Sequence, residues 1–248
     1  MRTIIWLVIA AVWLLILSFI GYSYFHSPSK SEFKAVQSFI SVSQQHVNGQ
    51  QIDINSVEGS DANADYVRIF AAYLNKLLEI NKRLADVKNG LIQLAQPATV
   101  ATGQSAYELL EKENGYEKQI MLIRGDLESE IQDVINKMNG LDKKEVKIFD
   151  IVSFTTDLSQ GKAERDKEIS QYTGLAAYVK TMLEFVKTRT GKFQLGADGG
   201  LHFGQPADQE YYNQLVTGIN QYVKLIDDLN EKHNKEDRKL VNDMSSAK

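Results

Sequence analysis

The chain has 248 residues, no cysteine and a formal net charge of −4, from 28 Lys and Arg against 32 Asp and Glu. Without cysteine it has no disulfides, zinc–thiolate sites or thiol catalysis. The slightly acidic balance argues against nucleic acid as the main partner, because phosphate binding needs a basic surface. A chain of this length can bury a core without covalent cross-links.

The first feature along the chain is an apolar segment at residues 4–20, which only Ser18 interrupts, and no charge follows until Lys30. At 1.5 Å per helical residue it is long enough to cross a hydrocarbon core of about 30 Å. Four aromatic residues lie near its two ends in the pattern of a membrane-interface belt: Trp6 near the first end, and Tyr22, Tyr24 and Phe25 after the second. The pattern predicts a transmembrane anchor over residues 1–27, with these four residues at the membrane interfaces.

Whether this segment is retained depends on its length and on its exit. A secretory signal has an apolar stretch of 7–15 residues, which this segment exceeds, although Gly21 and Ser23 leave cleavage open. Basic residues near its ends are almost balanced, with Arg2 before it and Lys30 and Lys34 after it. We expect a retained anchor with the large C-terminal part outside the cytoplasm, and a cytoplasmic orientation stays open as the alternative.

Helical periodicity then begins at residues 31–47 and resumes after a Gly-containing loop at 48–60. The most regular pattern has two columns of apolar residues spaced by seven: Phe70, Leu77, Leu84 and Leu91, and Tyr73, Ile80, Val87 and Leu94. It predicts a helix over 62–95 that packs lengthwise against its neighbours and ends before Pro97.

Three more helical stretches follow a loop at 97–104, namely 106–138, 142–158 and 163–190. Each has apolar residues at steps of three or four, the signature of one buried helix face. Gly115 and Gly125 lie inside the first of them and cost about 1 kcal/mol each relative to Ala, which leaves a bend there open.

Residues 193–195 and 201–203 alternate apolar and polar side chains around a Gly-rich turn, which predicts a short β-hairpin over 192–204. A two-stranded hairpin is marginal in water, so its aromatic face must rest on helices. A last helix starts near Pro206, and the charged tail at 236–248 is expected to be flexible. The predicted fold is therefore mainly all-α: one antiparallel helical bundle over 28–235, with a C-terminal β-hairpin and an N-terminal transmembrane helix.

The search for chemistry finds no catalytic, cofactor-binding or metal-binding residues. The histidines are dispersed, without a metal-ligand spacing: His26, His46, His202 and His233. The turn at 196–200 lacks the Lys-Ser/Thr of a phosphate loop. Six tyrosines recur along the apolar stripes: Tyr66, Tyr73, Tyr116, Tyr172, Tyr212 and Tyr222. They are interpreted as core-edge residues with the hydroxyl in water, or alternatively as the lining of a ligand pocket between helices.

Residues 190–217 combine Gly191-Lys-Phe-Gln-Leu, the Gly200–Phe203 strand and a helix that opens with Gln205-Pro-Ala-Asp-Gln-Glu-Tyr-Tyr-Asn. This stretch resembles the C-terminal part of the YiaF-like family of bacterial envelope proteins, and the similarity lies mainly in residues 145–217. The resemblance implies a bacterial helical envelope protein of unassigned function and carries over no catalytic residue. Members of that family carry a lipoprotein cysteine, which the apolar segment replaces here.

The expected function is therefore non-catalytic: a membrane-anchored helical bundle of the bacterial envelope that acts by protein or ligand binding. We expect a single pass through the bacterial inner membrane, with the bulk of the chain in the periplasm. Expected partners are the lipid bilayer, through the N-terminal helix, and a protein or a second copy of the chain, with no cofactor and no nucleic acid. Two alternatives stay open: a cytoplasmic-facing scaffold similar to LemA-type proteins, and a small-ligand-sensing bundle that works with a partner.

Overall fold

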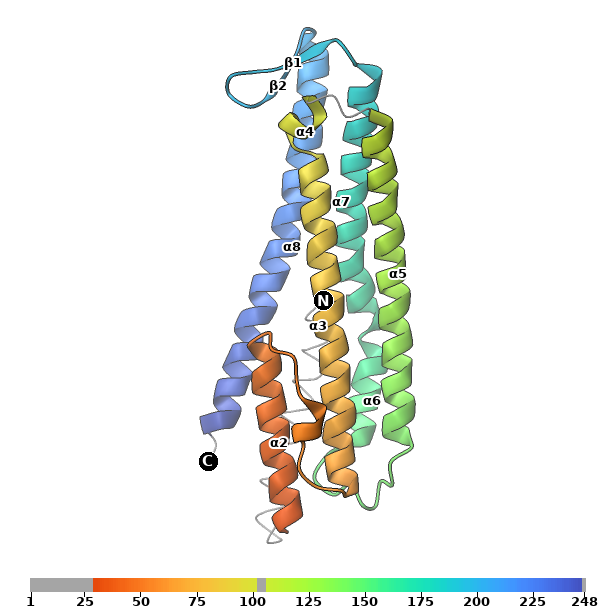
Figure 1. Cartoon of the computed structure of the whole chain (residues 1–248), viewed down its shortest axis with the longest axis vertical. Coiled ribbons are helices and arrows are strands. Elements are labelled where there is room, and N and C mark those ends of the chain that lie inside the picture. The colour runs from red at the N-terminus through yellow and green to blue at the C-terminus, as the bar shows by residue number, and fades with distance from the viewer. Residues whose placement is uncertain (1–28, 102–105, 247–248) are drawn as a thin grey trace. The chain divides into compact units, whose positions relative to one another are not determined.

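The computed structural model describes residues 29–101 and 106–246 (Figure 1). Its elements in chain order are α2 (Lys30–Val47), the 3-10 helix η1 (Ile54–Ser56), α3 (Ala62–Leu94), α4 (Pro97–Ala101), α5 (Ala106–Asn139), α6 (Ile151–Gln160), α7 (Lys162–Thr188), β1 (Phe193–Leu195), β2 (Leu201–Phe203) and α8 (Pro206–Ser246). The described chain is mainly helical with one small antiparallel hairpin, which confirms this part of the predicted fold.

The described residues form two compact units. The first unit contains residues 29–81, 126–166 and 229–246, and the second contains 82–101, 106–125 and 167–228. The first unit holds all of α2, η1 and α6, whereas the second holds α4 and the hairpin. Helices α3, α5, α7 and α8 contribute residues to both.

An aromatic cluster forms the core of the first unit. Its members come from α2, α3, α6 and the loop before α6, and all are buried: Phe39, Tyr66, Phe70, Phe149 and Phe154. The rings of Tyr66 and Phe149 stack with centroids 4.4 Å apart, and those of Phe39 and Phe70 lie 4.7 Å apart. Such ring pairs add about 0.5–1.5 kcal/mol to the stabilisation from their buried area.

Two asparagines of α3 fix the loops of the first unit. The Asn75 amide accepts a hydrogen bond from the Ile52 N–H at 2.8 Å and donates one to the Ile52 carbonyl at 2.9 Å. Asn63, which is buried, likewise accepts from the Lys147 N–H at 3.2 Å and donates to the Glu145 carbonyl at 3.5 Å. Side-chain amides thereby satisfy backbone groups that have no helix or strand partner.

The predicted start of one helix was wrong, and residues 97–101, which were expected in a loop, form the short helix α4. The helix expected at 142–158 begins only at Ile151, because Asp142 accepts a hydrogen bond from the Lys144 N–H and starts a turn. Asp150 then caps α6 by accepting from the Ser153 N–H at 3.0 Å. Burial raises the pKa of the Asp150 carboxyl, but the hydrogen bonds from Ser153 outweigh this effect and hold the pKa below its usual value.

The predicted apolar stripes do form the helix cores. All eight residues of the two columns in α3 are buried, and so are Leu175, Val179 and Leu183 on α7. Helix α5 runs through Gly115 and Gly125 as one element, and neither glycine has a neighbour that an added Cβ would touch. Helix α8 continues through residues 236–246, where the flexibility expected from the sequence stays a prediction.

The expected single-pass location in an inner membrane is contradicted. Across residues 29–101 and 106–246, no helix is long and apolar enough to cross a membrane. The physical reason is that charges recur along the long helices, as Lys76, Glu79 and Lys82 do on α3. The anchor predicted over residues 1–27, with Trp6, Tyr22, Tyr24 and Phe25 at the interfaces, lies outside the described residues.

Candidate functional site

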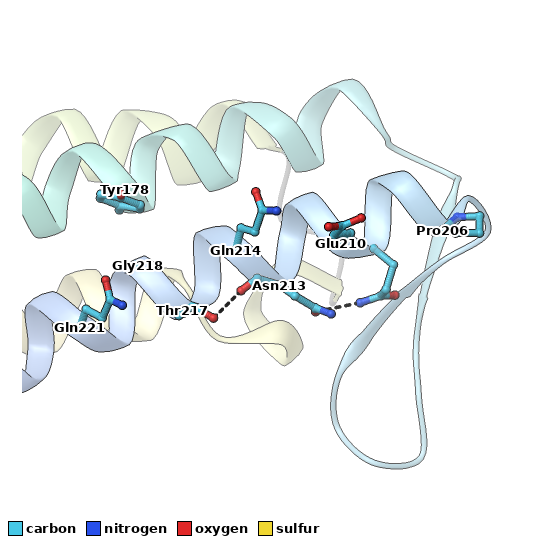
Figure 2. A pocket seen from close by; sticks show the side chains of 9 residues that line it. Tyr178, Pro206, Glu210, Asn213, Gln214, Thr217, Gly218 and Gln221 are labelled. Carbon is cyan, nitrogen blue, oxygen red and sulfur yellow. Dashed lines mark hydrogen bonds between the residues drawn. The ribbon is translucent and has the colours of Figure 1, made fainter.

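A hollow on the second unit runs along the N-terminal half of α8, beside Tyr178 of α7 (Figure 2). Its volume is about 610 Å³, and it is lined by Tyr178, Pro206, Gln209, Glu210, Asn213, Gln214, Thr217, Gly218 and Gln221. We call this surface the α7–α8 groove. Glu210 is the only charged group in its lining, so the groove is almost neutral and rich in amide and hydroxyl groups.

A reciprocal glycine–tyrosine arrangement brings α7 and α8 close together beside the groove. The Tyr178 ring of α7 covers Gly218 of α8 so closely that a Cβ at position 218 would overlap it, and Tyr222 of α8 covers Gly174 of α7 in the same way. The two rings lie 5.5 Å apart at an interplanar angle of 48°. Each glycine precedes its own helix's tyrosine by four residues, which places both pairs on the facing sides of the two helices.

Two side chains of the groove have unused hydrogen-bonding groups. Gln214 and Gln221 are exposed and make no side-chain hydrogen bond to another described residue. Each amide offers two donors and an acceptor to a ligand. Other polar side chains of the groove are hydrogen-bonded within the second unit. The Gln209 amide donates to the Asn213 side chain at 3.1 Å, and the Thr217 hydroxyl donates to the Asn213 backbone carbonyl at 2.8 Å.

A smaller hollow of about 380 Å³ adjoins the groove, because both are lined by Tyr178 and Gln214. Its remaining lining residues are Ala177, Thr181, Tyr211 and Leu215. Tyr178 and Tyr211 are about 40 % exposed, at 38 % and 43 %. Aromatic rings that present a face and a hydroxyl to solvent are suited to binding another molecule. The two hollows therefore form one surface that combines amides with tyrosine rings.

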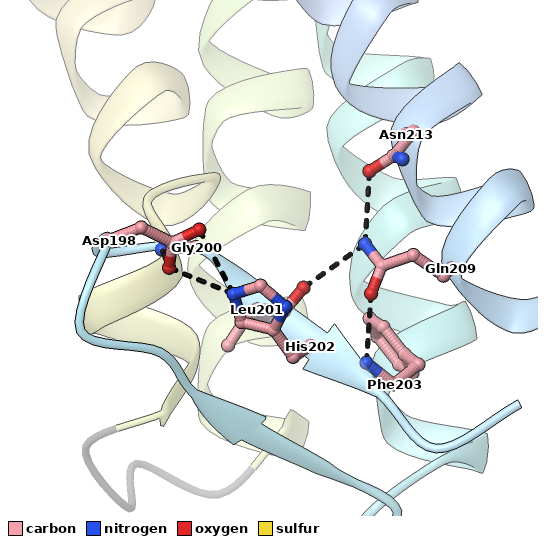
Figure 3. Close-up of polar contacts among 7 residues, drawn as sticks. All are labelled: Asp198, Gly200, Leu201, His202, Phe203, Gln209 and Asn213. Atoms are coloured by element: carbon pink, nitrogen blue, oxygen red, sulfur yellow. Dashed lines mark hydrogen bonds and ion pairs between the residues drawn. The ribbon is translucent and has the colours of Figure 1, made fainter. Parts of the chain in front are cut away.

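The hairpin beside the start of α8 is held by the Gln209 side chain (Figure 3). Its amide oxygen accepts from the Phe203 N–H at 2.9 Å, and its amide nitrogen donates to the Leu201 carbonyl at 3.2 Å. Gln209 thus satisfies the backbone groups of β2 that face away from β1, where an unpaired strand edge would otherwise be exposed. The same residue links the hairpin to the groove.

Figure 3 also shows the polar side of the hairpin, where His202 bonds both carboxylate oxygens of Asp198 at 2.8 and 3.0 Å. The hydrogen bond from His202 lowers the pKa of the Asp198 carboxyl. Both side chains are at least half exposed. The pair closes the turn at the surface of the second unit.

A buried acidic residue lies elsewhere in the second unit, on α5. Glu113 is fully buried, and neither of its carboxylate oxygens has a hydrogen-bond partner. Lys180 of α7 lies 3.9 Å from Glu113 Oε2, but it donates instead to Glu117 Oε2 at 2.9 Å and to Asn114 Oδ1 at 3.0 Å. The pKa of the Glu113 carboxyl is raised to about 7, mainly by burial and also by the nearby charges of Glu117 and Glu184, whereas Lys180 opposes the shift. We call these four charged residues the Glu113 cluster.

The tyrosines singled out from the sequence have different environments. Tyr66 and Tyr73 are completely buried, with hydroxyls that lack a hydrogen-bond partner, so their interpretation as core-edge residues was wrong. Burial raises the pKa of both hydroxyls. Tyr222 packs against Gly174, and Tyr116 packs against Gly90 of α3 in a similar contact. None of the six tyrosines lines the groove, whereas Tyr178, which the sequence analysis did not single out, does.

A signal for Glu113 was present in the sequence. The apolar stripe of α5 starts at Leu109 and continues through Tyr116 and Ile120. At steps of three and four, position 113 belongs to that stripe, so a carboxylate there is a buried charge in an apolar series. The signal for the groove is weaker, because exposed glutamines on a helix are ordinary surface residues.

The described residues include no group of three or more His, Cys, Asp or Glu side chains that could hold a metal ion. Comparisons of the chain with known protein families, with curated proteins and with solved structures found no match.

Proposed function

We propose that this protein acts by binding, and that the α7–α8 groove holds an uncharged, polar polypeptide segment of a partner protein. The observation that carries the proposal is the pair of exposed, unengaged amides at Gln214 and Gln221 beside the Tyr178 ring. A peptide group offers one donor and one acceptor, which a side-chain amide can pair in both directions, as Asn75 does with Ile52.

The open form of the groove supports a polypeptide ligand over a small molecule. Small-molecule sites are concave and bury most of the ligand's surface. The groove instead runs along one helix, and Asn213, Gln214, Thr217 and Gln221 are all exposed along it. A partner segment could lie lengthwise there, with one of its apolar residues against Tyr178. The residues that carry the proposed resemblance to the YiaF-like family include the hairpin and the start of α8, which belong to the same unit as the groove.

The proposal is tested by placing a photo-crosslinking amino acid at Gln221 in the full chain in its native cells. The matched control carries the same amino acid at Gln45 on α2, which lines a polar hollow of similar volume, about 580 Å³, in the first unit. We expect one defined protein to be captured from position 221 but not from position 45. Tyr178→Ala should reduce that capture at least tenfold, because aromatic side chains contribute a large share of binding energy.

Equal capture from both positions, or capture that Tyr178→Ala leaves unchanged, would contradict a role for the groove. Gln221→Ala, purified with the captured partner, should weaken binding by about 1 kcal/mol for one lost hydrogen bond. Titration calorimetry of the pair would measure this loss.

A further inference from the structure

Glu113 occupies a position where an ionised carboxylate is unstable. It lies on the apolar face of α5 and is fully buried. An ionised carboxylate in such a place needs hydrogen bonds or a paired cation, and no donor is bonded to either of its oxygens. The protonated carboxyl removes the charge, and so the surroundings of Glu113 favour the neutral form.

The contacts of Lys180 agree with a neutral Glu113. Its ammonium group donates to Glu117 and to Asn114, which leaves one of its three N–H donors for another acceptor. Glu113 Oε2 is 3.9 Å away, about 1 Å beyond hydrogen-bonding distance. A side-chain rotation that moves the ammonium group by about 1 Å would let it bond Glu113 in place of Glu117 or Asn114.

The charges around Glu113 come from both helices. Within the described chain, Glu117 of α5 and Glu184 of α7 disfavour its ionised form, and Lys180 of α7 favours it. The four groups of the cluster therefore carry a net charge of −1 when Glu113 is protonated and −2 when it is ionised. The second acidic charge would weaken the contact between α5 and α7 unless Lys180 moved inward to Glu113.

We propose that Glu113 is a proton-binding site that switches Lys180 between two hydrogen-bonding arrangements, so that the contact between α5 and α7 in the second unit responds to pH near neutrality. In the acidic arrangement, Lys180 holds Glu117 and Asn114 while Glu113 keeps its proton. In the basic arrangement, Glu113 has released the proton and Lys180 bonds its carboxylate. The inference does not depend on the ligand proposed for the groove.

The experiment is a pH titration of the full chain by NMR, with ¹³C in the glutamate side-chain carboxyl groups. For a pKa of about 7, the ratio of protonated to ionised Glu113 should fall from about 10:1 at pH 6 to about 1:10 at pH 8. One glutamate signal should titrate in this range, well above the others. The ammonium or Cε signals of Lys180 should change with the same midpoint. A Glu113 midpoint below pH 5.5, or a Lys180 signal that stays constant between pH 6 and 8, would overturn the proposal.

Variants of the cluster should shift the Glu113 titration midpoint in directions that the neighbouring charges determine. Glu113→Gln should remove the titrating signal and the change at Lys180. Glu117→Gln should lower the Glu113 midpoint, because it removes a repulsive charge and releases Lys180. Lys180→Met should raise the midpoint, and Glu210→Gln, on the exposed side of α8, should leave it unchanged. If Glu113→Gln does not fold, the Glu117→Gln titration still decides: an unchanged or raised midpoint contradicts the proposal.

Discussion

At the scale of single residues, the glycines inside the described helices fall into two classes, according to what a methyl group would meet. Gly218, Gly174 and Gly90 each lie under a tyrosine ring, so an added Cβ would overlap it. Gly125 on α5 faces open space within the described structure. The first class exists for close helix packing, whereas the second only lowers the stability of its helix.

We therefore predict opposite effects for Gly218→Ala and Gly125→Ala. The first should destabilise the protein by about 1–2 kcal/mol, because Tyr178 must leave its position against α8. The second should stabilise it by up to about 1 kcal/mol, through better helix propensity. Urea unfolding of both variants measures the difference. In the Tyr178→Ala background the cost of Gly218→Ala should disappear, and persistence of that cost would show that the ring contact is not its cause.

A second prediction at this scale concerns Asn75. Asn75→Ala removes both hydrogen bonds to Ile52 and leaves its partly buried backbone groups unsatisfied. We expect a loss of about 2–3 kcal/mol in the free energy of unfolding, since each unmet group costs about 1–3 kcal/mol. Hydrogen exchange at the Ile52 amide should accelerate before global unfolding. Asn136→Ala on the exposed side of α5, whose partner is Gln132, serves as the control and should change stability by less than about 0.5 kcal/mol.

At the scale of elements, hydrophobic periodicity predicted which segments would be helices, but local polar contacts determined where one of them begins. The stripes of α3 and α7 are buried as predicted, because period 3.5–3.6 permits little besides a packed helix face. The predicted start of α6 was wrong because two contacts keep the preceding residues out of the helix. Asp142 starts a turn, and Asn63, more than 80 residues earlier in the chain, holds Glu145 and Lys147 by their backbone groups. Contacts of this kind leave no local pattern in the sequence.

The hairpin illustrates the same limit. Alternation predicted its strands and their pairing, which the structure confirms with Phe193 opposite Phe203. The hydrogen bonds of Gln209 to β2 were not predicted, because its side-chain amide meets the strand backbone only in the folded unit. The groove escaped prediction for the same reason, since Tyr178 and Gly218 meet across two helices.

Gln209→Met keeps the length of the side chain but removes its hydrogen bonds to β2. We predict that exchange at the Phe203 amide will accelerate at least tenfold, which corresponds to about 1.4 kcal/mol of lost local protection. Hydrogen exchange followed by mass spectrometry of the 193–205 region would detect it. Gln221→Met, on the same helix but away from the hairpin, should leave this region unchanged. Equal protection in the two variants would mean that Gln209 does not hold the strand.

At the scale of the whole molecule, titrating groups influence unfolding with opposite signs. Asp150 has a lowered pKa in the folded chain, because the hydrogen bonds of α6's first turn outweigh the effect of burial. Its contribution to stability is present above its unfolded pKa and is lost as the pH falls below it. Glu113 has a raised pKa in the folded chain, so its effect on the free energy of unfolding is opposite: stability falls as the pH rises.

The expected pH dependence of unfolding follows from Glu113. The unfolded chain releases this proton near pH 4.5, whereas the folded chain retains it until about pH 7. Folding therefore binds a proton in this interval, and the free energy of unfolding should fall as the pH rises through it, by about 3 kcal/mol in total. The loss should be complete at pH 8. Urea unfolding between pH 5 and 8 should show this decline in the wild type and a flatter profile in Glu113→Gln, which has no proton to release. Parallel profiles for the two proteins would place the ionisation of Glu113 in its ordinary range.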